Sequence, residues 1–234
     1  MDFRISSILS ALALVSLVIG TKGFSSSNGW VNLVENNSEA PAAVKKCTIE
    51  RGAGLPTAGS TVEIEYVGKF GPSPVTWTVE DVVEAWLKPQ QGLYDLLNEP
   101  FRTHGVDGKT LCNPEVFNEA FIYDMGVTNK IQCKKTIMAA KRLIAQIQEP
   151  AFAEGVIFDT SASRNKNYEF VLGAGKAIKA MDLLVASMEI GERAQLQARS
   201  DFCYGSEGYR KTSGEVLVPP FATLCFDVTL ISAK

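Results

Sequence analysis

Histidine is almost absent from this sequence: His104 is the single one among 234 residues. A mechanism that needs a histidine base with orienting partners, or a metal site built from several histidines, therefore lacks its parts. The five cysteines include no CxxC pair, so the usual redox and zinc motifs are missing as well. We accordingly expect neither a metal nor a cofactor.

An excess of positive charge is also missing. The chain has 23 Lys and Arg against 26 Asp and Glu, which gives a formal net charge of -3. Without a basic surplus, nucleic acid is not an expected partner. Hydrophobic residues make up 46% of the chain and charged residues 21%, proportions that are ordinary for a globular protein with a buried core.

The longest apolar run lies at the N-terminus, where Arg4 precedes residues 8–19 and Gly20 and Gly23 follow. The run is short for a membrane-spanning helix and is typical of a cleavable signal peptide. We assign residues 1–23 to this signal peptide, with a retained anchor or a core helix as alternatives. Residues 24–43, rich in Ser, Asn, Ala and Glu, are predicted to be a flexible leader.

The predicted N-terminal signal peptide indicates the cellular compartment of the protein. A signal peptide predicts the secretory pathway, either the ER lumen or secretion, with membrane contact only during targeting. Phe24 and the serines that follow it resemble the bipartite plastid presequences of algae with secondary plastids. A plastid location, in the thylakoid lumen, is therefore the alternative.

Alternating hydrophobic residues predict a half-buried sheet. Val62, Ile64 and Tyr66 alternate with glutamates, and similar patterns return at residues 168–172, 193–199 and 223–231. Residues 176–188 have helical spacing and would place Ala177 and Met181 toward the sheet. The pattern predicts an α+β fold, in which an antiparallel twisted sheet wraps around one short helix.

Residues 71–154 show helical spacing instead and predict a small helical subdomain. Thr78 and Asp81 are typical of a helix cap, whereas Pro89 and Pro100 are expected to end the first two helices. A third helix is expected to begin at residues 113–115, and a fourth covers residues 129–148. Cys112 and Cys133 both lie in this region, either as a disulfide or as free thiols.

Several motifs outside the helical region are similar to those of the FKBP-type peptidyl-prolyl cis-trans isomerases. They are Tyr66-Val-Gly68, Gly155-Val-Ile-Phe-Asp-Thr-Ser161, Tyr168-Glu-Phe-Val-Leu-Gly173, Asp201-Phe-Cys-Tyr-Gly205 and Val218-Pro-Pro-Phe-Ala-Thr-Leu-Cys-Phe226. The resemblance covers residues 44–70 and 155–234, which we assign to one isomerase domain. Residues 71–154 stand where the family has only a short hairpin connection, so they form an insertion.

The resemblance implies a peptidyl-prolyl cis-trans isomerase that acts on Xaa-Pro bonds of folding client proteins, as a chaperone does, through an apolar aromatic pocket. It assigns catalysis to Tyr66, Phe158, Asp159, Ile178, Tyr204 and Phe226. It assigns substrate binding to Arg164, Tyr168, Phe170, Ala177, Met181 and Val218, with Phe170 as the one closest to a purely structural residue. Macrolides of the rapamycin class are further ligands that it implies.

Two departures from the family pattern keep an alternative function open. Met181 stands where the family commonly has a tryptophan pocket floor, and the loop after Gly208 is longer than usual. A flexible thioether offers a less rigid surface for a proline ring than an indole does. The alternative is a weakly active or inactive binding module whose helical insertion docks a partner protein.

Overall fold

The computed structural model describes residues 29–34 and 42–234, which form two compact units. Of these residues, the first unit holds 29–34, 42–69, 157–198 and 224–234, and the second holds 70–156 and 199–223. The predicted signal peptide, residues 1–23, and most of the predicted leader lie outside the described residues. In the described ranges, no helix has both the length and the apolar character needed to cross a bilayer.

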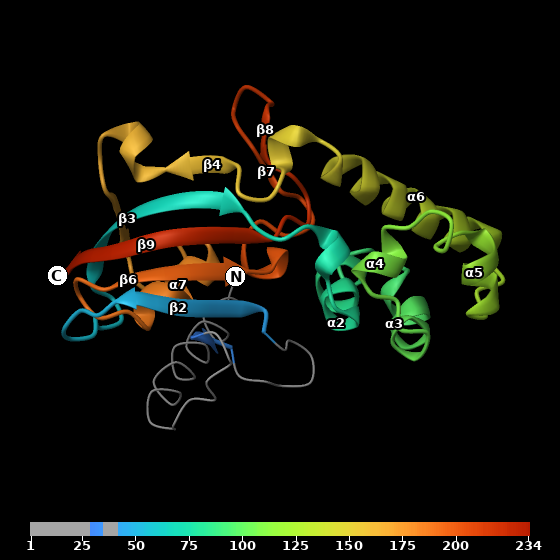
Figure 1. The fold of residues 1–234 in the computed structure, drawn as a ribbon, viewed down its shortest axis with the longest axis horizontal. Helices are drawn as coiled ribbons and strands as arrows, with labels where there is room; N and C mark the ends of the chain where they lie inside the picture. Colours follow the sequence, from blue (N-terminus) through green and yellow to red (C-terminus); the bar gives the residue numbers. More distant parts are fainter. Residues whose placement is uncertain (1–28, 35–41) are drawn as a thin grey trace, which may run out of the picture. The chain divides into compact units, whose positions relative to one another are not determined.

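The first unit contains a sheet of seven strands among the described residues, in the order β1-β2-β6-β9-β3-β4, with β5 also paired to β3 (Figure 1). The pairs β1–β2, β2–β6, β6–β9, β3–β4 and β3–β5 are antiparallel. The strands are β1 Trp30–Asn32, β2 Val44–Glu50, β3 Thr61–Phe70, β4 Ile157–Thr160, β5 Tyr168–Val171, β6 Arg193–Ala198 and β9 Leu224–Ala233.

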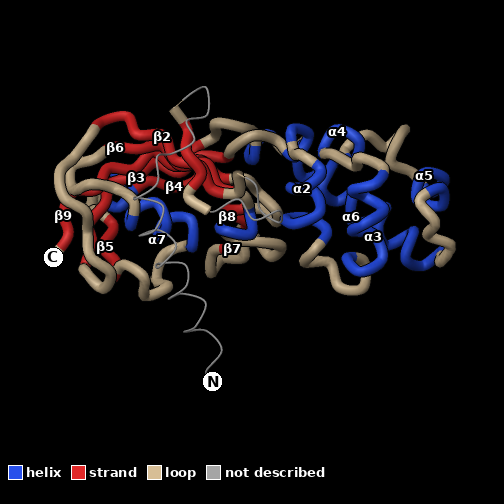
Figure 2. Tube along the Cα trace, turned by 90° about the horizontal axis from the view of Figure 1, so that it is seen from below, coloured by secondary structure: helices blue, strands red, loops and turns tan. Residues whose placement is uncertain are grey.

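One face of this sheet is buried against helix α7, Lys179–Ala186, which lies on one side of the strands in Figure 2. Alternation along each strand sends every second side chain to that face. The buried set is Val62, Ile64 and Tyr66 of β3, Ala194, Leu196 and Ala198 of β6, Leu224, Phe226, Val228 and Leu230 of β9, and Ala180, Met181, Leu184 and Val185 of α7. The predicted α+β fold, an antiparallel sheet around one short helix, is confirmed.

A buried ion pair joins β2 to the end of α7. Lys46 Nζ lies 2.8 Å from Glu192 Oε1 and donates to the carbonyl oxygen of Ser187 at 2.7 Å. Glu192 also accepts from the Thr48 hydroxyl at 2.8 Å and from the Glu189 N–H at 2.7 Å. Both charged side chains are nearly inaccessible, so this hydrogen bonding offsets the cost of their burial.

The second unit is mainly helical. Its elements before Val156 are η1 Pro74–Thr76, α2 Val79–Asp81, the π-helix η2 Val82–Leu87, α3 Tyr94–Thr103, α4 Gly108–Leu111, α5 Glu119–Asp124, α6 Lys130–Ile147 and η3 Pro150–Phe152. Its remaining elements are η5 Ser200–Phe202 and the two-stranded ribbon of β7 Tyr209–Arg210 and β8 Val216–Val218. A core of large side chains holds the helices together, including Trp86, Leu97, Phe101, Leu111 and Ile122.

The helix ends differ in part from the sequence prediction. Thr78 and Asp81 form the expected capping box, and α6 begins after Asn129 as predicted. Helix α3 continues through Pro100 instead of ending there, because a proline removes only one N–H donor and the buried Phe101 anchors the following turn. The third predicted helix begins later, after the N-cap Asn118, and the short α4 was not predicted.

Three further observations concern strand β1, residues 199–223 and two cysteines. Trp30–Asn32, inside the predicted flexible leader, pairs with β2 as strand β1, a stretch too short to give a clear alternating pattern. Residues 199–223, which the sequence places in the isomerase domain, belong to the same compact unit as the helices. Cys112 and Cys133 are free thiols, so the disulfide alternative is not realised.

The two ends of the helical segment meet through backbone hydrogen bonds. The Phe70 N–H donates to Val156 O at 3.0 Å, and the Gly155 N–H donates to Phe70 O at 2.9 Å. Phe70 also packs edge-to-face on Phe152, with ring centroids 5.6 Å apart. The insertion therefore leaves and rejoins the chain at one place.

Candidate active site

Aromatic side chains from four strands of the first unit form a continuous cluster. Tyr66 of β3 and Phe226 of β9 meet edge-to-face with ring centroids 6.3 Å apart, and Phe158 of β4 meets Phe226 at 5.8 Å. Tyr168 of β5 contacts Tyr66 at 6.1 Å and stacks on Phe170 at 5.3 Å. These five residues, named as candidates from the sequence, lie together in the first unit. Tyr66, Phe170 and Phe226 are buried, and Phe158 and Tyr168 are half-buried.

Gly68 makes this ring packing sterically feasible. A Cβ atom at Gly68 would lie 2.9 Å from Cζ of Phe158 and 3.0 Å from Cε1 of Phe226. Such distances are too short for two carbon atoms, so any side chain at this position would displace a ring. The sequence analysis used Gly68 only as part of a motif and gave it no role in the site. The sequence pattern that could have identified Gly68 is a glycine inside a strand, because such a glycine often marks a place where another group packs closely on the backbone.

A carboxylate is held at the edge of the cluster. The Tyr66 hydroxyl donates to Asp159 Oδ2 at 2.6 Å, and Arg164 donates to Asp159 Oδ1 at 2.7 Å. The 3-10 turn η4, Ser161–Arg164, bends the chain back after β4, and Asn165 ends that turn in the left-handed region. The Arg164 side chain is 51% exposed, so this ion pair serves to orient Asp159 more than to stabilise the fold.

Tyr66 stays protonated in this setting. Burial raises the pKa of Tyr66 above its ordinary value, and the hydrogen bond to the Asp159 carboxylate raises it further. The Tyr66 backbone N–H is also fixed, since it donates to the buried Ser161 Oγ at 3.0 Å. The phenol is thus a positioned hydrogen-bond donor and has no role as a base near neutral pH.

Replacing Tyr66 with Phe should flatten the alkaline part of the stability profile. Because the pKa of Tyr66 is higher in the folded than in the unfolded protein, its contribution to stability is complete below about pH 10 and is lost as the pH rises toward the folded value. The free energy of unfolding, measured with urea from about pH 8 to 11, should fall less steeply in Tyr66→Phe than in the wild type. Parallel slopes would contradict this assignment.

Helix α7 brings the remaining candidates of the first unit. Ile178 is its N-cap residue, and N–H groups at the start of a helix have no acceptor within the helix. Ala177 and Ile178 are half-buried, and Met181, one turn into the helix, is 4% exposed. Asp182 accepts from the Gly173 N–H at 3.2 Å and so ties the helix to the turn after β5.

Tyr204 and Val218 lie in the second unit. Val218 is buried in β8 and pairs with Tyr209 of β7. The rings of Tyr204 and Tyr209 lie 5.5 Å apart, so Tyr209 joins Tyr204 in a small aromatic pair. Tyr209 lies in the long loop after Gly208 and was not a candidate from the sequence. Within the residues described here, no group of three or more His, Cys, Asp or Glu side chains is placed to hold a metal ion.

The first unit is an α+β domain in which an antiparallel sheet packs on one short helix and a cluster of aromatic rings lies beside an ion-paired carboxylate. A family model described as FKBP-type peptidyl-prolyl cis-trans isomerase matches residues 133–231. The match begins inside α6, upstream of the position where the sequence resemblance resumes.

Two named relatives of this chain agree with the family match. The chain is 45% identical over 80 residues to FK506-binding protein 1 of Dictyostelium discoideum, covering 34% of this chain and 70% of that protein. It is 38% identical over 81 residues to peptidyl-prolyl cis-trans isomerase Fkbp12 of Drosophila melanogaster, covering 35% of this chain and 70% of that protein. The chain belongs to the FKBP-type peptidyl-prolyl cis-trans isomerase family and carries a long helical insertion between β3 and β4.

Proposed function

We propose that this chain catalyses the cis-trans isomerisation of Xaa-Pro bonds in polypeptides, and that the aromatic cluster of the first unit binds the prolyl ring. The observation that supports this most strongly is the contact of Phe226 with both Tyr66 and Phe158, beside a carboxylate that Tyr66 and Arg164 hold in place. Folding client proteins are the substrates we propose.

The chemistry needs no covalent step. Rotation about an Xaa-Pro bond has a barrier of about 18–20 kcal/mol because it breaks amide resonance. The planar amide is more charge-separated than the twisted one, so an apolar surface stabilises the twisted form relative to the planar form. Rings that clamp the pyrrolidine and exclude water from it would therefore lower the barrier.

The polar groups fix the peptide on this surface. We assign the Ile178 N–H and the Tyr204 hydroxyl to hydrogen bonds with carbonyl groups that flank the prolyl bond, which orients the substrate without proton transfer. Asp159 would face the carbonyl that turns during the reaction. Tyr168, Phe170, Ala177 and Met181 would complete the apolar surroundings within the first unit.

Macrolides that present a similar apolar ring are proposed competitors for the same surface. The name of the Dictyostelium relative supports this, because it describes a protein that binds FK506. Met181 supplies a flexible pocket floor, so we expect a modest isomerase rate.

The test is an isomerase assay on short Xaa-Pro peptides, followed by two-dimensional exchange NMR. The wild-type protein should accelerate cis-trans exchange, and FK506 should abolish the acceleration. Lys109→Ala, a change on the exposed side of α4 in the second unit, serves as a control and should behave as the wild type does. Background exchange together with retained peptide binding would reject the enzyme and favour a binding module.

A further inference from the structure

We propose that the helical insertion holds residues 199–223 in position and thereby sets which residue before proline the enzyme accepts. Within the second unit, this segment carries Tyr204 and Val218, which are candidates for the wall that contacts the substrate. The inference rests on the proposed isomerase function. It assigns the insertion a part in substrate selection by that site.

The first connection is a buried arginine at the start of the segment. Arg199 is 5% exposed and makes a two-point contact with Asp201, with donor–acceptor distances of 2.8 and 2.9 Å. Its third contact, at 3.2 Å, is Oδ1 of Asp81 in α2. Asp81 is itself fixed, because its other carboxylate oxygen accepts from the Thr78 N–H in the capping box. Because Arg199 pairs with Asp201 of the segment and with Asp81 of α2, it anchors the segment to the first helix of the insertion.

The second connection lies at the end of the segment. The Trp77 indole N–H donates to the Thr223 hydroxyl at 3.2 Å, and both side chains are buried. The Gly71 N–H donates to Thr223 O at 2.9 Å. Residues 71–77 are the entry to the insertion, so both ends of the segment are attached to the entry and the first turn of the same helical region.

A third connection involves the turn after Pro219 and Pro220. The Gln146 side-chain amide of α6 donates to Pro220 O at 2.7 Å. Phe221 has a φ of 62°, a costly conformation for a residue with a large side chain, and it packs against the helical core. The packing of this ring on the insertion therefore helps to maintain a backbone conformation that the turn would not adopt by itself.

The turn is coupled to the candidate wall by short backbone contacts. The Phe221 N–H donates to Gly205 O at 2.8 Å, and Gly205 directly follows Tyr204. A Cβ atom at Gly208 would lie 2.4 Å from Val218 O, so the two arms of the ribbon approach closely. A shift of Phe221 or Pro220 would therefore reach both Tyr204 and Val218.

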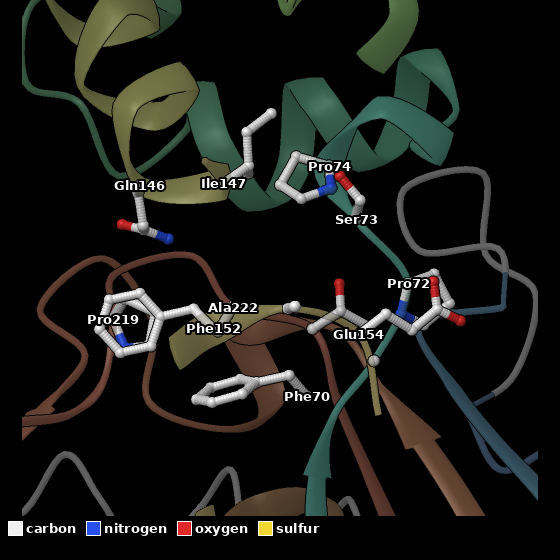
Figure 3. Close-up of a pocket in the computed structure, with 13 residues that line it drawn as sticks. Phe70, Pro72, Ser73, Pro74, Gln146, Ile147, Phe152, Glu154, Pro219 and Ala222 are labelled. Atoms are coloured by element: carbon white, nitrogen blue, oxygen red, sulfur yellow. The ribbon is translucent and has the colours of Figure 1, made fainter. Parts of the chain in front are cut away.

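A cavity lies between part of this segment and the helical insertion. The cavity has a volume of about 180 Å³. In Figure 3, Pro74, Gln146 and Ile147 lie on one side of it and Phe70, Phe152 and Pro219 on the other. Across this space the segment and the helices are not packed together. The hydrogen bonds and the Phe221 ring therefore decide the position of the segment, and single substitutions at those contacts should release it.

The experiment compares isomerase rates on a set of peptides that differ only in the residue before proline. Asp81→Asn weakens the contact with Arg199 but keeps an oxygen for the cap, and Gln146→Ala removes the bond to Pro220. In both variants, the ratio of kcat/KM between the best and worst peptides should change about three- to tenfold, the range expected when a positioning contact is lost. Hydrogen exchange of the backbone amides in residues 199–223 should accelerate in both.

Matched controls separate this role from general support of the fold. Glu80→Gln changes the neighbouring carboxylate, which pairs with Arg102 inside the insertion, and should leave the peptide ratio unchanged. Asp81→Glu, which keeps the charge, should restore most of the wild-type ratio.

The outcomes distinguish the inference from the function on which it rests. If the wild type accelerates exchange but Asp81→Asn and Gln146→Ala keep the wild-type peptide ratio, the inference is wrong and the isomerase function stands. If the wild type accelerates no peptide, the isomerase function fails. NMR titration with the same peptides then decides the inference, because unchanged relative affinities in both variants would overturn it.

Discussion

Phe226→Leu is expected to lower kcat/KM for Xaa-Pro isomerisation about tenfold or more, which corresponds to about 1.4 kcal/mol or more of lost transition-state stabilisation. The Phe226 ring is central in the cluster, with centroids 6.3 Å from Tyr66 and 5.8 Å from Phe158. Leucine fills a similar volume but lacks the flat ring that orders its two neighbours. The stability should change by less than about 1.5 kcal/mol, because the substitution nearly conserves the buried volume.

The measurement pairs exchange NMR with urea unfolding, so that a loss of rate is not confused with a loss of folded protein. Leu230→Met, on the same buried face of β9, is the matched control and should retain the wild-type rate. A Phe226→Leu protein with wild-type rate and wild-type stability would remove the aromatic cluster from the proposed mechanism.

Gly108→Ala is expected to have the largest effect on stability, a loss of about 4 kcal/mol or more. A Cβ atom at Gly108 would lie 1.9 Å from Pro74 O and 2.9 Å from Trp77 N. Both neighbours are backbone atoms, so no side-chain rotation can relieve the overlap. The substitution should also break the hydrogen bond from the Gly108 N–H to Trp77 O, now 2.9 Å long.

Thermal unfolding followed by circular dichroism provides the test. A loss of this size corresponds to a fall in Tm of about 8–16 °C for a chain of this length. Lys109→Ala, the next residue of α4 and exposed, should shift Tm by no more than about 2 °C. Equal Tm values for the two variants would show that the helices can separate at this contact without cost.

The sequence predicted those features that depend on neighbouring residues along one chain segment. Alternation in β3 and β9 was enough to place Tyr66 and Phe226 on the buried face, since strand geometry fixes side-chain direction. Thr78 and Asp81 indicated a helix start for the same reason, because a capping box spans only four residues.

The features that escaped prediction depend on contacts between distant segments. The Arg199–Asp81 contact joins residues 118 positions apart, and no local pattern indicates that the two side chains pair. The positive φ of Phe221 requires a neighbouring core that the local sequence does not specify. The continuation of α3 through Pro100 likewise depends on the burial of Phe101 in that core.

Backbone hydrogen bonds between Phe70, Gly155 and Val156 hold the two ends of the helical segment together. Another segment whose ends meet in the same way could therefore take its place. Because its two ends are already hydrogen-bonded, a short turn or an unrelated domain could replace it at little entropic expense to the β3–β4 pairing. Related proteins could therefore carry different insertions at this position, and each insertion would make different contacts with residues 199–223. Substrate choice could then diversify while the ring cluster stayed the same.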